Sequence, residues 1–428
     1  CWLIPGIITM IGAATNAEIA GLIAEPGGQY VYFKKMYGNA FAFLYGWSCF
    51  SVIQSASIAS IAYVFAESVN AVVALPRLPE IYEQVTLFEI FYPLQSFGVK
   101  GLTILTIIFL TSANYFGVVI GGTITNIFTA LKVLGIILII ILGFTISGGS
   151  TQNLTPVLEA PGFQYSSPLG LFGAMFAAML AAFWAYDGWN NIGFLGGEVK
   201  NPKRNIPISL FGGVALVILV YLAINAAFLY VLPVDEIISL TNNDHSIIAI
   251  EMMRKFLGYG GAIFISVLIM VSTFGTTNGT ILASSRIYFA MAKDNLFFKS
   301  AGSHHSKYRT PHLSLIIQGI WASLLVLSGT FDQLTDMLIF ASFIFYGAGA
   351  FGVFVLRKKM KDAVRVYKVP GYPVLPFIFV LFCIALVVVT IIENPRDAGI
   401  GLSLVLIGIP FYLFWRRKNK NSDEDLTV

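Results

Sequence analysis

Charge is the scarcest property of this sequence. Only 11% of its 428 residues are Asp, Glu, Lys or Arg, whereas a soluble domain carries about 25%. Hydrophobic residues make up 57% of the chain, and the mean hydropathy is +0.80. These numbers exclude a soluble globular protein, and the net charge of +4 therefore says little about nucleic acid. We expect a polytopic protein whose main partner is the lipid bilayer, with no nucleic-acid partner.

Cysteine and histidine are also scarce, with three and four residues. Cys1, Cys49 and Cys383 all fall in predicted membrane spans, so we expect no disulfide to a heavy subunit. The histidines are in or at the edge of loops, and none pairs with cysteine at metal-ligand spacing. We therefore expect no metal and no cofactor. A membrane-embedded enzyme is disfavoured because no buried His, Cys pair or Ser-base constellation is present.

Long apolar runs are abundant. A transmembrane helix needs roughly 20 apolar residues, and we identify eleven candidate runs. They start near Cys1, Gly38, Lys100, Thr123, Leu169, Ile206, Gly260, Pro311, Gln333, Val374 and Gly399.

The basic residues are distributed unevenly between the two sides of these spans. If successive loops alternate sides, 19 of the 26 Lys and Arg residues fall on one side and five on the other. The positive-inside rule places the first side, and with it the C-terminal tail, in the cytoplasm. We expect a multi-pass protein of the plasma membrane. Eleven spans then put Cys1 outside and already within a span, which suggests that one span precedes it.

Two long connections lie on the predicted outer side. We expect a short helix over residues 80–91 in the first and a surface helix over residues 246–257 in the second. These helices either cap an outer vestibule or merely connect spans, as most loops do.

One apolar run is interrupted by polar residues. Residues 183–191 read FWAYDGWNN, and a carboxylate at mid-depth costs on the order of 2.5 to 3.5 kcal/mol on insertion scales. Because Gly188 also loosens the helix, we predict a helix break at Asp187 and Gly188 that lines a cavity. Such a break leaves carbonyls without helical partners, here those of Phe183, Trp184 and Ala185, and their negative dipole end suits an ammonium group.

The order of spans indicates internal symmetry. Many transporters consist of two inverted repeats with paired broken helices, and five spans from the one near Leu169 onward form one such set. We divide the chain into a first repeat at residues 1–147, a second repeat at 148–358, and two C-terminal spans with the tail at 359–428. This pseudo-symmetry within one chain disfavours a channel built from symmetric subunits.

Four motifs in this order resemble one family. They are WAYDGWN at residues 184–190, EVKNPKRNIP at 198–207, FGTTNG at 274–279 followed by SSR at 284–286, and YKVPGYP at 367–373. The chain resembles the amino acid-polyamine-organocation superfamily over essentially its whole length, and within it the L-type amino acid transporters. The resemblance implies an all-α membrane protein with the LeuT-type inverted five-helix repeat plus two C-terminal helices. It also implies that eleven of twelve spans are present and that the first is missing.

The resemblance implies a substrate site around the broken helix. In such transporters the amino group of the substrate is held by carbonyls like those of residues 183–185, and the carboxylate meets a glycine-rich break in the first span. Trp184 would act as a gate or pack as an ordinary aromatic. Asp187 would contact a cationic substrate, carry a proton or bond freed backbone amides. Gly188 and Asn190 complete this wall.

Other spans supply further candidates. The resemblance implies that Lys132 takes the place of a bound sodium ion, as a lysine does in sodium-independent relatives, whereas a snorkelling lysine is the alternative. Thr273 and Thr276 match pocket positions and share one helical face with Thr280, which can equally serve helix packing. Two further residues match pocket positions but are also explained by plain packing: Ser57 and Phe343.

The sequence therefore predicts a secondary transporter that exchanges neutral L-amino acids by alternating access without sodium. A proton-coupled symporter with Asp187 or Glu198 as the proton carrier is the nearest alternative. An amino acid receptor without flux is the alternative from another class.

Overall fold

The structure is a computed structural model. It describes residues 2–23, 25, 27–87, 91–145, 149–154, 168–195, 199–241 and 247–424.

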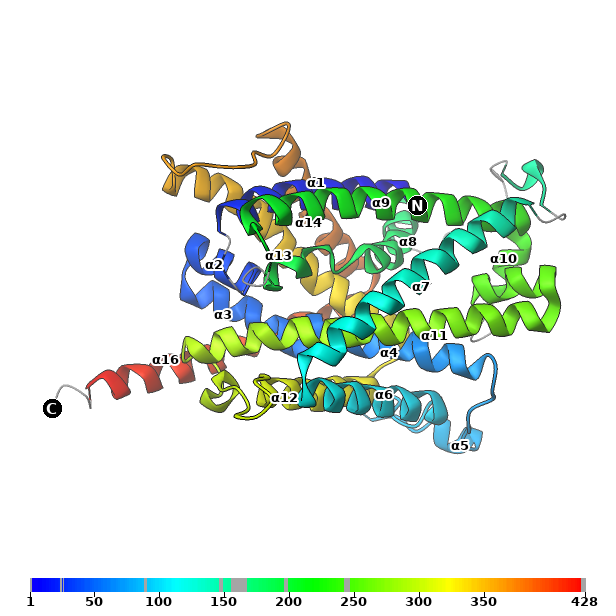
Figure 1. The fold of residues 1–428 in the computed structure, drawn as a ribbon, viewed down its shortest axis with the longest axis horizontal. Helices are drawn as coiled ribbons and strands as arrows, with labels where there is room; N and C mark the ends of the chain where they lie inside the picture. Colours follow the sequence, from blue (N-terminus) through cyan, green and yellow to red (C-terminus); the bar gives the residue numbers. More distant parts are fainter. Residues whose placement is uncertain are drawn as a thin grey trace.

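The described residues form helices almost throughout (Figure 1). Four short elements are a π-helix at Cys49–Ile53 and 3₁₀ turns η2 (Thr151–Leu154), η3 (Trp189–Leu195) and η4 (Lys299–Gly302). The α-helices are α1 (Leu3–Leu22), α2 (Gln29–Tyr37), α3 (Asn39–Ser48), α4 (Gln54–Asn70), α5 (Glu80–Glu83), α6 (Phe97–Phe116), α7 (Val118–Thr145), α8 (Gly170–Tyr186), α9 (Pro202–Val231), α10 (Val234–Thr241), α11 (Ile248–Lys293), α12 (His312–Ser328), α13 (Phe331–Lys359), α14 (Val374–Glu393), α15 (Pro395–Leu406) and α16 (Gly408–Glu424).

Ten helical stretches in the described ranges are long and apolar enough to cross a membrane. The prediction of an all-α membrane protein is therefore confirmed. Each of the eleven predicted runs contains a helix. The run near Pro311 forms only α12, whose 17 residues are fewer than in any of these ten stretches. The relation between two inverted repeats stays a prediction.

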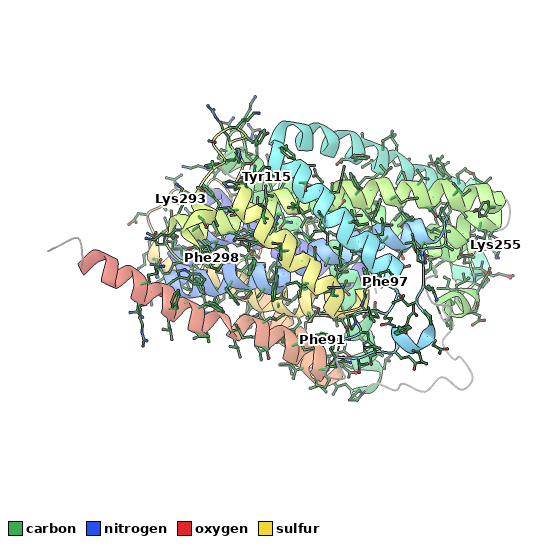
Figure 2. The ribbon with its side chains drawn as sticks, turned by 90° about the horizontal axis from the view of Figure 1, so that it is seen from below. Phe91, Phe97, Tyr115, Lys255, Lys293 and Phe298 are labelled. Carbon is green, nitrogen blue, oxygen red and sulfur yellow. The ribbon has the colours of Figure 1, made fainter. Side chains whose placement is uncertain are left out.

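The helices are arranged around a buried centre (Figure 1). Most side chains of α1, α4 and α13 are buried, whereas only 17% are buried in the apolar windows within Phe128–Thr145 of α7 and within α9. An apolar helix whose exposed side chains are hydrophobic is suited to contact with lipid. Figure 2 shows α11 running the length of the molecule, with Lys293 near one end and Lys255 near the other.

The connections assigned to opposite sides of the membrane lie at opposite ends of the molecule, while the assignment of inside and outside stays a prediction. α5 and α10 belong to the connections predicted outside, and both lie at one end in Figure 1. α2 and the C-terminal part of α16 carry basic residues predicted inside, and both lie at the opposite end.

Two local predictions need correction. The predicted helix over residues 80–91 is wrong at residues 84–87 and 91, which are not helical, and its residues 88–90 lie outside the described ranges. α5 is a single turn that buries none of its residues and gains no packing to extend it. The predicted helix over residues 246–257 exists, but it continues into the next span as α11, with a positive φ of 60° at Gly258 between them. A further helix, α2, was not predicted; it buries Tyr30, Tyr32, Phe33 and Met36.

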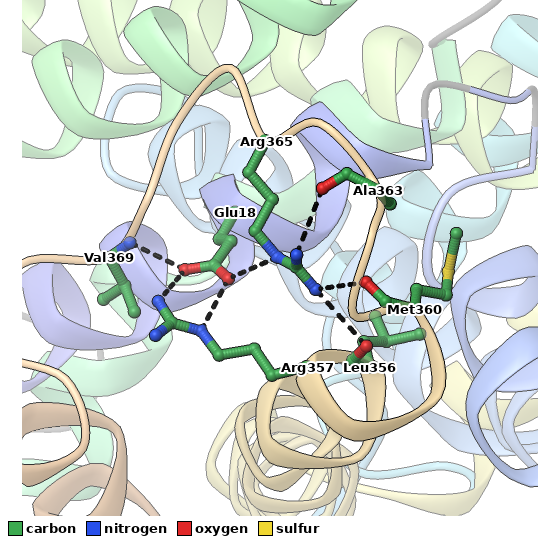
Figure 3. Close-up of polar contacts among 7 residues, drawn as sticks. All are labelled: Glu18, Leu356, Arg357, Met360, Ala363, Arg365 and Val369. Carbon is green, nitrogen blue, oxygen red and sulfur yellow. Dashed lines mark hydrogen bonds and ion pairs between the residues drawn. The ribbon is translucent and has the colours of Figure 1, made fainter.

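A buried charge cluster ties α1 to α13 and to the loop after it (Figure 3). Glu18 is only 3% exposed, and its carboxylate receives two bonds from Arg357, at 2.9 and 2.7 Å. The guanidinium of Arg365 lies 3.2 Å away, and the amide of Val369 donates at 2.8 Å. Arg365 also donates to carbonyls that end α13, so this carboxylate and its cations are paired.

Candidate functional site

The helix break predicted at Asp187 and Gly188 is confirmed. α8 ends at Tyr186, Asp187 is extended with φ −65° and ψ 162°, and a 3₁₀ turn follows from Trp189. Gly188 has a φ of +88°, in the left-handed region that favours glycine. The sequence AYDGW therefore interrupts a membrane helix at the one residue type that tolerates this conformation.

The carbonyls before the break are less free than predicted. The amide of Asp187, which would bond Phe183 in a continued helix, donates to the carbonyl of Trp184 at 3.1 Å. The hydroxyl of Tyr221, on α9, donates to the carbonyl of Ala185 at 2.7 Å. The prediction that the three carbonyls lack helical partners is therefore wrong for Trp184, and the Ala185 carbonyl is bonded from another helix. A carbonyl oxygen has two lone pairs, so each can still accept a second donor.

The Asp187 carboxylate is held by neutral groups. The hydroxyl of Tyr346, on α13, donates to it at 2.5 Å, and the amide of Gly188 also bonds it. In the part of the chain that the structure describes, Asp187 forms no ion pair. Tyr346 is not among the residues predicted from the sequence, although it lies three residues after the candidate Phe343 and so on the same helical face.

A cavity of about 290 Å³ lies beside η3, between α7 and α11. The Lys132 amine donates to the hydroxyl of Thr276 at 3.5 Å and so joins the two helices. Asn191 of η3 also lines the cavity, and its amide oxygen accepts a bond from Gln54 of α4 at 3.3 Å. The other lining residues are small or apolar for the most part: Phe128, Thr129, Ile192, Ser272, Gly275, Gly279, Thr280 and Ala283. The cavity brings the candidates Lys132 and Thr276 together with the segment after the break.

The other polar candidates lie outside the lining of this cavity. The Trp184 indole donates to the hydroxyl of Ser60 at 3.2 Å and meets the ring of Phe331 edge-on at 5.1 Å. Ser57 is one turn away from Ser60, whose hydroxyl donates to its carbonyl. The hydroxyl of Thr273 bonds a carbonyl of its own helix. Trp184 therefore bridges α8, α4 and the start of α13.

Phe343 and Asn190 are both buried, each 4% exposed. The ring of Phe343 packs edge-on against Phe183 at 4.6 Å between centroids. Its other side faces an apolar groove at the surface of the helix bundle. Phe343 therefore packs between the broken helix and this groove.

Some candidates cannot be placed. Glu198, the second proposed proton carrier, and Cys1 lie outside the described residues. Cys49 and Cys383 are buried free thiols. Within the described ranges, no group of three or more His, Cys, Asp and Glu side chains is arranged to hold a metal ion.

Comparison with known proteins gives consistent matches. Residues 1–412 match the family model described as "Amino acid permease". The chain is 33% identical over 423 residues to the serine/threonine exchanger SteT of Bacillus subtilis (strain 168), covering 98% of this chain and 89% of that protein. It is 29% identical over 416 residues to the human b(0,+)-type amino acid transporter 1, covering 97% and 79%. It is 30% identical over 423 residues to the mouse large neutral amino acids transporter small subunit 2, covering 98% and 75%.

Proposed function

The chain belongs to the amino acid permease family, so we propose that it exchanges neutral L-amino acids across a membrane by alternating access, without sodium. The observation that carries the proposal is the break in α8 at Asp187 and Gly188, beside a cavity that a fixed lysine amine lines. Transporters bind substrate where a membrane helix is unwound, because freed carbonyls and amides then face the cavity. The name of the bacterial relative, a serine/threonine exchanger, supports small neutral substrates.

The break supplies acceptors for the substrate's ammonium group. The carbonyls of Phe183, Trp184 and Ala185 end α8, and the Asp187 carboxylate follows them directly. Gly188 and the buried Asn190 form the start of the next turn. These groups would hold the ammonium, while Trp184 would close over the substrate. Its indole forms one hydrogen bond to α4, so only this hydrogen bond has to break when the indole moves.

Sodium independence rests on Lys132. Its amine lies between α7 and α11, within 3.5 Å of the Thr276 hydroxyl. A fixed positive charge at this point repels a metal cation, and at 4 Å the repulsion is about 4 kcal/mol at an effective dielectric constant of 20. Lys132 would therefore take the structural place of a sodium ion while preventing its binding.

The test is counterflow in liposomes that contain the purified full-length protein. Liposomes loaded with unlabelled serine should accumulate labelled serine or threonine, and empty liposomes should not. Replacing sodium by choline should leave the rate unchanged. Uptake that is equal in loaded and empty liposomes would overturn exchange, and a rate that requires sodium would overturn the role of Lys132.

A proton-coupled symporter is the second candidate, because the donors to Asp187 are neutral and leave it free to take up a proton. In that case an inward proton gradient should drive accumulation into empty liposomes. Substrate binding without any flux, measured by scintillation proximity on the same protein, would instead support a receptor.

The orientation and partners are proposed on the same basis. We place the C-terminus in the cytoplasm of a plasma-membrane protein, because the basic segments gather at the end where α16 finishes. The burial of Cys49 and Cys383 supports the absence of a disulfide-linked subunit. Cysteine-specific labelling of a cysteine introduced into the tail, before and after cell permeabilisation, tests the orientation.

A further inference from the structure

An apolar groove opens on the outer surface of the helix bundle. It has a volume of about 910 Å³ and lies between α3, α13, α14 and α16. Its walls include Phe343 and Ala348 from α13, Ile384 from α14, and Ile409 and Tyr412 from α16. The groove is separate from the cavity beside η3, with which it shares no lining residue.

The groove offers almost nothing to a polar ligand. The hydroxyl of Tyr37, at its edge, already donates to the carbonyl of Ala348 at 2.6 Å. Several wall residues are exposed despite being apolar, among them Phe351 and Ile384. Because α13 and α14 are both long enough to cross a membrane, the medium that meets this groove is hydrocarbon.

Basic residues extend two walls of the groove beyond its lining, one on α16 and one on α13. Arg416 follows Tyr412 by four residues, and Lys358 follows Phe351 by seven, so each continues a groove-lining face toward the end of its helix. Both side chains are exposed. The amine of Lys359 donates to the carbonyl of Met36, directly before Tyr37. No acidic residue lines the groove.

We propose that this groove binds one acyl chain of an anionic glycerophospholipid, with the phosphate at Arg416 on the α16 wall. The charge of Arg416 fixes the headgroup, and the apolar walls accept the chain. A transmembrane helix of 20 residues, about 30 Å long and 10 Å wide, fills roughly 2,400 Å³. The groove therefore cannot enclose a whole helix of a partner protein or of a second copy.

The lipid would support the broken helix through Phe343. This ring lines the groove on one side and packs on Phe183 of α8 at 4.6 Å on the other. One turn further, Tyr346 holds the Asp187 carboxylate. An occupied groove would therefore keep α13 pressed against the break. This step rests on the proposed function, whereas lipid binding itself does not.

The binding test uses phospholipids with a photoactivatable diazirine in the acyl chain. Diazirine phosphatidylglycerol, present as a trace in phosphatidylcholine liposomes with the full-length protein, should cross-link to residues of α13, α14 and α16 around the groove. Ile384→Trp and Ala348→Leu add bulk to the groove and should reduce this labelling at least several-fold. Ile378→Trp is the matched control, because Ile378 is also an exposed residue of α14 but does not line the groove.

The headgroup is tested with charge variants. Arg416→Gln should reduce phosphatidylglycerol labelling about fivefold, the effect of one basic residue near an anionic lipid. Arg417→Gln, one residue further round α16, should reduce it much less. Diazirine phosphatidylcholine should label weakly in all variants.

Four outcomes would overturn the proposal. They are equal labelling of Ile384→Trp, Ala348→Leu and the unmodified protein; equal labelling by the two lipids; equal effects of Arg416→Gln and Arg417→Gln; and cross-links through this face between two copies of the chain. If counterflow fails while groove labelling behaves as expected, the proposed function fails and the lipid site stands.

Discussion

Two carboxylates inside this protein are held in opposite ways. Glu18 has two guanidinium groups and a backbone amide around it, so its charge is matched within the fold. Asp187 receives a tyrosine hydroxyl and a glycine amide, both neutral, and no ion pair in the part of the chain that the structure describes. A buried charge is costly unless it is paired.

The difference separates a structural carboxylate from a functional one. Glu18 needs no further counter-charge, and it holds the ends of α1 and α13 together. Asp187 lies at a helix break and lacks a fixed cation, so its counter-charge must arrive from elsewhere. The ammonium group of an amino acid substrate is the cation that the proposed function supplies.

The largest expected effect comes from neutralising Glu18. Glu18→Gln leaves Arg357 and Arg365 near each other without their shared anion, and breaking a buried pair in this way costs about 3 to 5 kcal/mol. We expect a large fall in the melting temperature, measured by thermal challenge and size-exclusion chromatography in detergent. Glu25→Gln is the control, because Glu25 pairs with Lys35 at the exposed surface, where a pair is worth about 0 to 1 kcal/mol. Equal stability of the two variants would show that the cluster is not structural.

Asp187→Asn should show the reverse pattern. The amide keeps an oxygen acceptor for Tyr346 and Gly188, so we expect little loss of stability. Losing a hydrogen bond to a charged group costs about 1.5 to 3 kcal/mol, so KM for serine counterflow should rise roughly 10- to 150-fold. An unchanged KM would remove the substrate's ammonium group as the partner of Asp187. Loss of pH dependence with an unchanged KM would favour the proton carrier.

The membrane helices and the helix break depend on local composition, and both could be predicted from the sequence. Apolar runs of the length of a membrane predict helices, because no other backbone arrangement of such a run is stable in lipid apart from a barrel. The break was predictable because Asp187 and Gly188 each oppose a continuous apolar helix. The family match over residues 1–412 confirms the resemblance that four motifs indicated.

The partners of the site residues were not predictable in the same way. Tyr346 is 159 residues from Asp187, and Arg357 is 339 residues from Glu18, so no periodicity connects them. The Ala185 carbonyl accepts a hydrogen bond from Tyr221, which lies on another helix. The helix α2 was missed because its buried face packs against distant parts of the chain, which local hydropathy does not register.

Gly188→Ala tests whether the geometry of the break matters beyond the charge. Alanine at a φ of +88° costs roughly 1 to 2 kcal/mol, and the added methyl group meets only the Asn191 amide at 3.5 Å. We therefore expect a purely conformational effect, with a lower melting temperature and a reduced counterflow rate. Gly212→Ala is the control, because Gly212 lies within α9 with open space around it. A Gly188→Ala variant that matches this control would show that the break tolerates another backbone.

Tyr346→Phe gives the smallest effect on KM and the sharpest comparison. It removes a hydroxyl donor to a carboxylate, worth about 1.5 to 3 kcal/mol of stability, and leaves the packing of the ring on Trp189 and Phe343 intact. Tyr288→Phe removes a buried hydroxyl bond to a neutral acceptor, the carbonyl of Cys49, which is worth about 0.5 to 1.5 kcal/mol and lies away from the break. Only Tyr346→Phe should change KM for serine, because only Tyr346 positions the Asp187 carboxylate. Since it acts on the substrate through Asp187, we expect a change of about 2- to 12-fold, equivalent to about 0.5 to 1.5 kcal/mol. If both variants change KM equally, the hydroxyl acts through packing, and Asp187 needs no orientation to meet its counter-charge.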